Sequence, residues 1–395
     1  MKYPEYIGEI IRRFEACGES AYIVGGGLRD MMLGIEPHDY DIATSALPKK
    51  TAEIFSDKHV IETGLKHGTV TVVFDGEPVE ITTFRIDGSY TDMRHPDSVS
   101  FTDDITLDLS RRDFTINAMA YSPSRGLVDP FFGRADIEKR LICAVGDPVK
   151  RFSEDALRIM RAYRFSAQLG FSIDEGTLDA AMKMAEGLAL IARERIANEF
   201  FKLITSGDPY RSLVMMQRNG ALKYVLGEYE PSDEILSQLC KMPAMVPARM
   251  GLLLSRADED TAREILRSLR ASGKQTTGAL AVARGACLKT ASPADARRLF
   301  ALVGIYAEHA ALASELLEIS PSGAYEMTKR QADTPTSIRD LKVNGKDMAK
   351  LGASGRLIGD TLSALLSMVV DDPTLNDREK LLALAEETIN KSKGN

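Results

Sequence analysis

The feature that most constrains the fold is a change of sequence pattern near residue 146. Before it, short β-branched and aromatic runs predict strands: AYIV enters a glycine turn, and residues 69–84 read as a hairpin with Asp75-Gly76 at its turn. Tyr6 to Phe14 carry apolar residues at helical spacing, with Gly18 as a stop. After residue 146, long Leu-, Ala-, Glu- and Arg-rich segments are separated by short turns. The sequence therefore predicts an α+β protein, with an α/β head around a mixed β-sheet and an all-helical remainder.

The length and charge of the chain limit the number of domains and the kinds of partner that we expect. A chain of 395 residues is long enough for several domains, and its 50 basic and 57 acidic residues leave a net charge of −7. This balance argues against a general polycation but allows local basic patches. The four cysteines form no CxxC pair and are expected to be buried, reduced thiols. The N-terminus lacks a signal-peptide core, and no run of about 18 apolar residues was found, so we expect a cytoplasmic protein without a membrane partner.

A glycine-rich turn follows the first predicted strand. Gly25, Gly26 and Gly27 would let the backbone approach a ligand and present N–H groups, and Arg29 could neutralise a phosphate. The turn lacks the Lys-Ser/Thr of a Walker A loop. Taken alone, such a turn is more often structural than functional.

Three acidic residues form the next candidate group. Asp39 and Asp41 are two apart, so in a strand their carboxylates share a face and repel one another unless a cation lies between them. Mg²⁺ prefers such oxygen ligands. Glu80 lies on an apolar strand, where a lone acid usually faces solvent. Opposite the aspartates, Glu80 would instead complete a three-carboxylate cluster for two-metal catalysis.

Two later segments carry charged pairs. Arg111 and its neighbouring arginine suit a triphosphate, and Asp113 could accept a hydrogen bond from a ribose 2′-hydroxyl; a basic helix start is the alternative. Ser153 is expected to cap the helix that contains Asp155 and Arg158, which could form a simple ion pair. Alternatively, this carboxylate and guanidinium match the donor and acceptor on the edges of cytosine and adenine, but not of uracil or guanine.

The order of these motifs is that of the nucleotidyltransferase superfamily. The segments AYIVGGGLRD, HDYDIATSALP, RRDFTINAMAY, FSEDALRIMRAYRFSAQLGF and ERIANEFFKL together resemble the class II CCA-adding enzymes, or tRNA nucleotidyltransferases. The resemblance implies template-independent addition of C, C and A to the 3′ end of tRNA from CTP and ATP, with release of pyrophosphate.

The resemblance also implies roles for individual residues. Asp39 and Asp41 would bind Mg²⁺, and Glu80 would be the third catalytic acid. The nucleotide would be bound by the following residues: Gly25, Gly26, Arg29, Arg111, Asp113, Asp155, Arg158, Arg161 and Arg164.

The resemblance divides the chain into four domains. These are a catalytic nucleotidyltransferase head (1–142), a helical neck that recognises the base (143–207), a helical body (208–319) and a helical tail (320–395) that grips tRNA.

Other functions are considered beside this one. An enzyme that adds only the terminal A would share these motifs, and the segment 88–101 with Arg94 favours A addition without separating the two. A bacterial poly(A) polymerase would carry a strongly basic stretch where this chain has TGLKHGT. A non-enzymatic RNA-binding protein would not need the acidic cluster, and a small-molecule nucleotidyltransferase would not need the long helical half.

Overall fold

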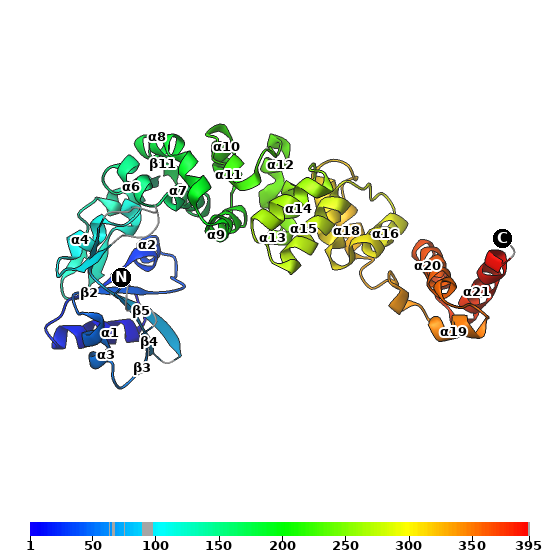
Figure 1. Ribbon diagram of the computed structural model, residues 1–395, viewed down its shortest axis with the longest axis horizontal. Helices are drawn as coiled ribbons and strands as arrows, with labels where there is room; N and C mark the ends of the chain where they lie inside the picture. The colour runs from blue at the N-terminus through cyan, green and yellow to red at the C-terminus, as the bar shows by residue number, and fades with distance from the viewer. Residues whose placement is uncertain (63, 65–67, 75, 89–97, 394–395) are drawn as a thin grey trace. The chain divides into compact units, whose positions relative to one another are not determined.

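The computed structural model describes the chain except for residues 63, 65–67, 75, 89–97 and 394–395 (Figure 1). Arg94 and most of TGLKHGT therefore lie outside the described residues. The chain forms two compact units. The first comprises Met1–Leu203 with Met215–Val225, and the second comprises Ile204–Val214 with Leu226–Asn395. The four domain boundaries stay predictions.

A seven-stranded mixed sheet forms the centre of the first unit. Its strand order is β3-β4-β5-β2-β1-β8-β9, and only the β2–β5 pair is parallel. The predicted hairpin is present as β4 and β5, with Phe74 opposite Glu77. The bounds are β1 Ala21–Val24, β2 Asp41–Thr44, β3 His59–Ile61, β4 Thr69–Phe74, β5 Glu77–Thr83, β8 Ala120–Ser122 and β9 Gly126–Val128.

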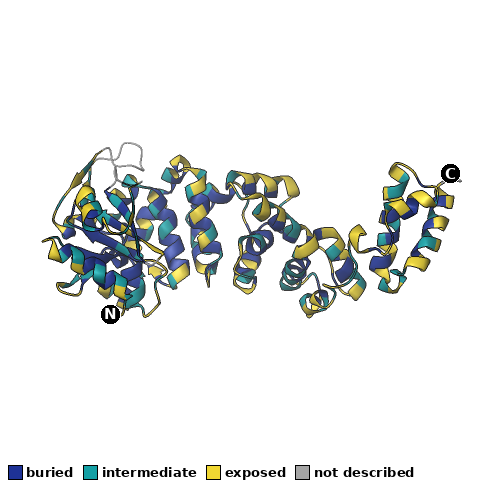
Figure 2. Cartoon of the chain, turned by 90° about the horizontal axis from the view of Figure 1, so that it is seen from below, coloured by how far each residue is buried: buried dark blue, intermediate teal, exposed yellow. Residues whose placement is uncertain are grey.

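Helices pack on this sheet through apolar faces (Figures 1 and 2). The predicted first helix is α1, Glu5–Ala16, which buries Ile7, Ile10, Ile11 and Phe14. The ring of Phe14 contacts Phe55 edge-on at a centroid distance of 5.3 Å. The other helices around the sheet are α2 Gly25–Met32, α3 Pro48–Ile54, α4 Ile105–Ser110 and α5 Gly133–Lys139, and β6 Arg85–Asp87 pairs with β7 Val99–Phe101 beside them.

The rest of the first unit is helical, as predicted, apart from a short parallel pair of β10 Leu141–Ile142 and β11 Ser172–Ile173. In α7, Tyr163 is fully buried, and Gly170 ends the helix in a left-handed conformation. The helices are α6 Pro148–Glu154, α7 Leu157–Leu169, α8 Glu175–Lys183 and α9 Arg193–Ile204, followed by α10 Tyr210–Arg218 and α11 Lys223–Leu226 at the division between the units.

The second unit consists of helices. Its last three helices share a core that includes Leu365, Val369, Leu381 and Ala385. The helices are α12 Asp233–Gln238, α13 Val246–Leu253, α14 Glu259–Ser268, α15 Gly273–Ala286, α16 Pro293–Val303, α17 Ala307–Leu316, α18 Ala324–Lys329, α19 Gly345–Lys350, α20 Arg356–Asp371 and α21 Arg378–Lys393.

One segment of the second unit is long and apolar enough to cross a membrane. Among the described residues this is Pro293–Leu316, by length and composition only. The chain bends within it at Gly304, which has a φ of 58°, and so divides it into α16 and α17. Leu299 and Val303 of α16 pack against Ala307 and Ala310 of α17. Core packing accounts for part of the apolar character of this segment, of which 39% is buried.

The cysteines differ in part from expectation. All four are free thiols, but Cys17, Cys240 and Cys287 are exposed and Cys143 is half-buried. The prediction that they are buried is therefore wrong for at least three of them.

Candidate active site

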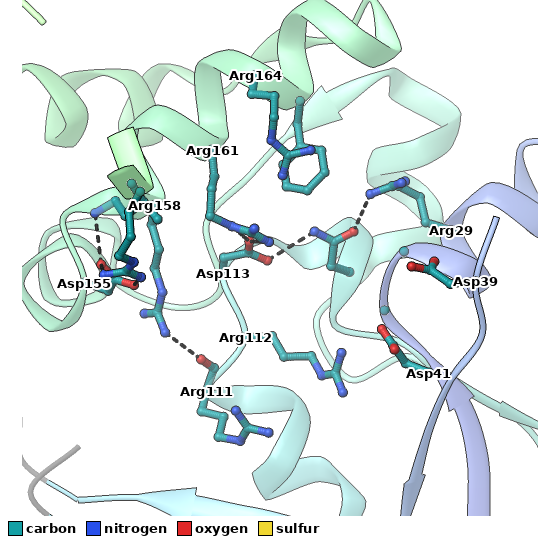
Figure 3. A pocket seen from close by; sticks show the side chains of 16 residues that line it. Arg29, Asp39, Asp41, Arg111, Arg112, Asp113, Asp155, Arg158, Arg161 and Arg164 are labelled. Atoms are coloured by element: carbon teal, nitrogen blue, oxygen red, sulfur yellow. Dashed lines mark hydrogen bonds and ion pairs between the residues drawn. The ribbon is translucent and has the colours of Figure 1, made fainter. Parts of the chain in front are cut away.

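A cavity of about 530 Å³ in the first unit collects almost all the candidate residues (Figure 3). Of the twelve that the sequence singled out, only Glu80 does not line it. The predicted residues that line it are Gly25, Gly26, Arg29, Asp39, Asp41, Arg111, Asp113, Asp155, Arg158, Arg161 and Arg164. Five more complete the lining: Arg112, Asn117, Leu157, Phe165 and Arg195.

The glycine turn lets the backbone approach the acidic residues. The chain leaves β1 at Val24 and enters α2 through Gly25, whose φ of 69° favours glycine. A Cβ on Gly25 would lie 3.4 Å from Asp41 Oδ2, and one on Gly27 only 2.8 Å from the carbonyl oxygen of Asp39. A side chain at Gly27 would therefore clash with the backbone of Asp39, whereas at Gly25 the contact with Asp41 is an ordinary one and the positive φ is what favours glycine.

Arg29 extends from α2 into the cavity with its guanidinium held on two sides. Its side chain is 9% exposed and pairs with Asp30 Oδ1 at 2.7 Å. It also donates to Asn117 Oδ1 at 2.9 Å. These bonds orient the guanidinium before any ligand binds.

The two aspartates lie together at the start of β2. Asp41 is the first residue of the strand, and Asp39 precedes it by two. Burial, reinforced by the negative charge of Asp39, raises the pKa of Asp41 to about 6, although Arg112 opposes the shift. A divalent cation would relieve this repulsion, and two carboxylates are the hard oxygen donors that Mg²⁺ prefers. The donor set therefore fits the predicted metal.

Glu80 is placed beside this pair but outside the cavity. In the parallel β2–β5 ladder its Cα is the partner of Asp41, and its charge contributes to the raised pKa of Asp41. The side chain is exposed. Within the described ranges, no group of three His, Cys, Asp or Glu residues is arranged to hold a metal ion. The catalytic role of Glu80 stays a prediction.

Asp108 holds the two arginines and was missed by the sequence analysis. Its side chain is 1% exposed and accepts from Arg111 Nη2 at 2.8 Å and from Arg112 Nη2 at 3.3 Å. Burial would raise the pKa of Asp108, but the two guanidinium groups hold it below its usual value. The signal was present in the sequence, since an acid three and four residues before paired arginines can bond to both at the end of a helix.

Asp113 is a buried carboxylate with strong partners. Its Oδ2 accepts two bonds from Arg161, at 2.7 and 2.6 Å, and its Oδ1 accepts from Asn117 Nδ2 and from the Phe114 amide. Burial acts to raise the pKa of Asp113, but Arg161 and Asn117 lower it to about 2. A ribose hydroxyl would therefore bond to a carboxylate that the protein already orients.

The prediction that Ser153 caps the helix containing Asp155 and Arg158 is wrong. Ser153 lies inside α6, where its hydroxyl bonds to the Lys150 carbonyl, and Asp147 caps that helix instead. The next helix, α7, begins only at Leu157. Asp155 therefore occupies the extended link between two helices.

The alternative of an ion pair between Asp155 and Arg158 is also not observed. Asp155 pairs with Arg195 at 2.7 Å, and Arg158 pairs with Glu154 at 2.7 Å. Arg158 also donates to the backbone carbonyls of Arg151 and Arg111 at 3.0 Å. A guanidinium has five N–H donors, and the bonds to described residues use three of them. Arg158 therefore has donors left for a ligand.

An aromatic ring contacts three guanidinium groups that line the cavity. The ring centroid of Phe165 lies 3.9 Å from the guanidinium carbon of Arg164, 5.1 Å from that of Arg29 and 5.2 Å from that of Arg161. Glu199 of α9 pairs with Arg164 and lies 3.9 Å from Arg161. The positive charges of Arg29, Arg161 and Arg164 therefore line one cavity. Such an arrangement suits a polyanionic ligand.

Comparison with known proteins identifies the family. Residues 21–143 match the family model described as the poly A polymerase head domain, and residues 170–232 match the probable RNA and SrmB-binding site of polymerase A. A CCA-adding enzyme of Leuconostoc mesenteroides is 36% identical over 392 residues, covering 96% of each chain. The chain belongs to the CCA-adding enzyme family. A member from Lactiplantibacillus plantarum is 37% identical over 95% of this chain and 94% of its own.

Solved structures of the family agree with this fold. The CCA-adding enzyme of Bacillus stearothermophilus in complex with CTP superposes with a TM-score of 0.85, at 32% identity and full coverage of both chains. The Thermotoga maritima enzyme complexed with tRNA has a TM-score of 0.72 at 23% identity, covering 98% of this chain and 95% of its own. The latter likeness concerns the fold alone.

Proposed function

We propose that this chain adds cytidine, cytidine and adenosine to the 3′ end of tRNA, using CTP and ATP and releasing pyrophosphate. The observation that carries the proposal is that one cavity contains the acidic pair Asp39 and Asp41, several arginines, and the pair Asp155 and Arg158. Arg158 still has N–H donors that a ligand can use. The names of the relatives support it, as does the CTP in the Bacillus stearothermophilus structure. The cytoplasm, where tRNA is matured, is the compartment in which we expect this activity.

The triphosphate would be held by residues of α2 and by Arg111, which follows α4. The backbone of Gly25 and Gly26, together with Arg29 and Arg111, would bind its oxygens through charge-assisted hydrogen bonds. Asp39 and Asp41 would hold Mg²⁺, which would neutralise charge on the phosphates and favour ionisation of the attacking hydroxyl. The tRNA 3′-oxygen would then bond to the α-phosphorus as the bond to pyrophosphate breaks.

The sugar and base would be recognised by the residues farther along the chain. Asp113 would accept from the ribose 2′-hydroxyl, which would favour ribonucleotides. Asp155 would accept from the amino group of cytosine or adenine, and Arg158 would donate to the adjacent ring nitrogen. Arg161 and Arg164 would support the nucleotide by their charge and by orienting Asp113.

The decisive experiment uses three tRNA acceptors that lack CCA, CA or A. With CTP and ATP, we expect all three to be completed to CCA and then to stop. Completion of only the third acceptor would identify an A-adding enzyme. A long poly(A) product on unrelated RNA, without CCA addition, would identify a poly(A) polymerase.

Base selection gives a prediction for Arg158. We expect Arg158→Ala to reduce the preference for CTP over UTP by about 10–100-fold, because the donor that pairs with the cytosine ring nitrogen is lost. The measurement is kcat/KM for both nucleotides on a tRNA lacking CCA. Arg134→Ala is the matched control, since Arg134 also pairs with a glutamate four residues away but lies outside the cavity. Unchanged selection in Arg158→Ala would refute the assigned role.

A further inference from the structure

The side-chain amide of Asn117 is hydrogen-bonded at both ends, its oxygen to Arg29 and its nitrogen to Asp113. It ends a short 3₁₀ helix, Thr115–Asn117, and is 6% exposed. Its Oδ1 accepts from Arg29 Nη1 at 2.9 Å, and its Nδ2 donates to Asp113 Oδ1 at 3.1 Å. Asn117 itself lines the cavity but was not singled out from the sequence.

These bonds belong to a longer chain of contacts across the site. Arg29 extends from α2, and Asp113 is bonded in turn by Arg161 from α7. Asn117 is therefore the link between the element that carries Arg29 and the one that carries Arg161. An amide suits this place because it presents an acceptor to the cationic neighbour and a donor to the anionic one.

We propose that Asn117 is a positioning residue that holds Arg29 and Asp113 in register, so that the triphosphate and the ribose are bound as one unit. The inference rests on the proposed function, in which Arg29 binds the triphosphate and Asp113 the ribose. Both groups are common to CTP and ATP. The role of Asn117 is therefore to serve both nucleotides equally, whereas Asp155 and Arg158 distinguish between bases.

The first test replaces Asn117 by aspartate, which has nearly the same shape. In Asn117→Asp the acceptor toward Arg29 is kept, but the donor toward Asp113 is lost and two carboxylate oxygens face one another. We expect kcat/KM to fall by about 10-fold or more for both CTP and ATP, by the same factor, because the lost donor is a buried hydrogen bond to a charged group. The preference for CTP over UTP should not change.

A second variant and a control separate bonding from packing and charge. Asn117→Ala removes both bonds without adding charge and should also lower kcat/KM equally for the two nucleotides. Gln331→Glu makes the same amide-to-carboxylate change at a side chain that also accepts from an arginine, Arg297 Nη1 at 2.9 Å, but that does not line the cavity. This control should stay within about two-fold of the wild type, as expected for a substitution outside the site. Thermal unfolding of each variant checks that it is folded.

A double-mutant cycle tests the link itself. Arg29→Lys and Arg161→Lys are combined in the wild-type background, where we expect their effects on kcat/KM for CTP to depart from additivity by about 5-fold or more. In the Asn117→Ala background, we expect the same two substitutions to be additive. A role of Asn117 in packing alone would leave the departure from additivity unchanged.

The outcomes distinguish this inference from the proposed function. Failure of the wild type to add CCA would refute the function. Wild-type CCA addition combined with full activity of Asn117→Asp, unequal losses for CTP and ATP, or a cycle insensitive to Asn117→Ala would overturn the role of Asn117 alone.

Discussion

Replacing Asp39 and Asp41 together by alanine is expected to lower kcat for nucleotide addition by about 10³-fold or more, while tRNA binding stays within about two-fold. Four aspartates are among the described residues that line the cavity. Asp113 is paired with Arg161 and Asp155 with Arg195, which leaves Asp39 and Asp41, beside the glycine turn, as the expected Mg²⁺ ligands. They lie beside the glycine turn where we propose that the triphosphate binds, so their loss should stop the reaction without removing the surfaces that bind tRNA. Single-turnover kinetics and filter binding measure the two effects.

Thermal unfolding gives a test of the same pair that does not depend on activity. The folded-state pKa of Asp41, about 6, is above that of an exposed aspartate, so the folded protein retains a proton that the unfolded chain has released. In the absence of metal, this group therefore lowers the stability of the fold progressively as pH rises from about 4 to about 6, and the loss stays constant at higher pH. Mg²⁺ should raise Tm more at pH 7.5 than at pH 5, and should have no such effect on the double variant.

The matched control is Glu228→Ala combined with Glu230→Ala. These acids are also two residues apart, but both are exposed and lie outside the cavity. Their replacement should leave kcat and the Mg²⁺ effect unchanged. Full turnover in the variant lacking both Asp39 and Asp41 would disprove the metal site.

Arg161→Met is expected to reduce the free energy of unfolding by about 3–5 kcal/mol, because it leaves the buried carboxylate of Asp113 without its counterion. Asp113 is only 8% exposed, and both of its bonds to Arg161 are lost in the variant. Urea unfolding followed by circular dichroism measures the difference from the wild type. Arg12→Met is the control, since Arg12 forms an exposed pair with Glu5 and its replacement should leave the free energy of unfolding nearly unchanged.

The pH dependence of this loss identifies its cause. In the wild type, the pKa of Asp113 is lowered to about 2, so its favourable contribution is complete above about pH 4 and is lost only as pH falls through 2. Without Arg161, burial would raise the pKa of Asp113, and the folded variant would take up a proton as pH falls. The loss of stability should therefore shrink between pH 8 and pH 5. A loss that is constant over this range would show that Asp113 is not responsible.

The local part of the fold was predictable because it depends on short-range periodicity. Alternating β-branched residues predicted the β4–β5 hairpin, and helical spacing of Ile7, Ile10 and Phe14 predicted α1. The helix cap at Ser153 was mispredicted because the chain forms two helices here, and Ser153 lies inside the first of them, α6, which Asp147 caps. The second, α7, begins at Leu157 after Ala156, and where one helix ends and the next begins is decided by packing.

The sequence by itself singled out residues that gather in space, since eleven of the twelve candidates line one cavity, while their roles stay predictions. Only the tertiary structure decided their partners: Asp155 pairs with Arg195, forty residues away, rather than with Arg158, and Arg29 bonds to Asn117 across 88 residues. The physical reason is that residue type fixes charge and hydrogen-bonding capacity, whereas pairing depends on distances of about 3 Å. Long arginine side chains can reach several carboxylates, and the packing of α7 and α9 decides which of these lies within reach.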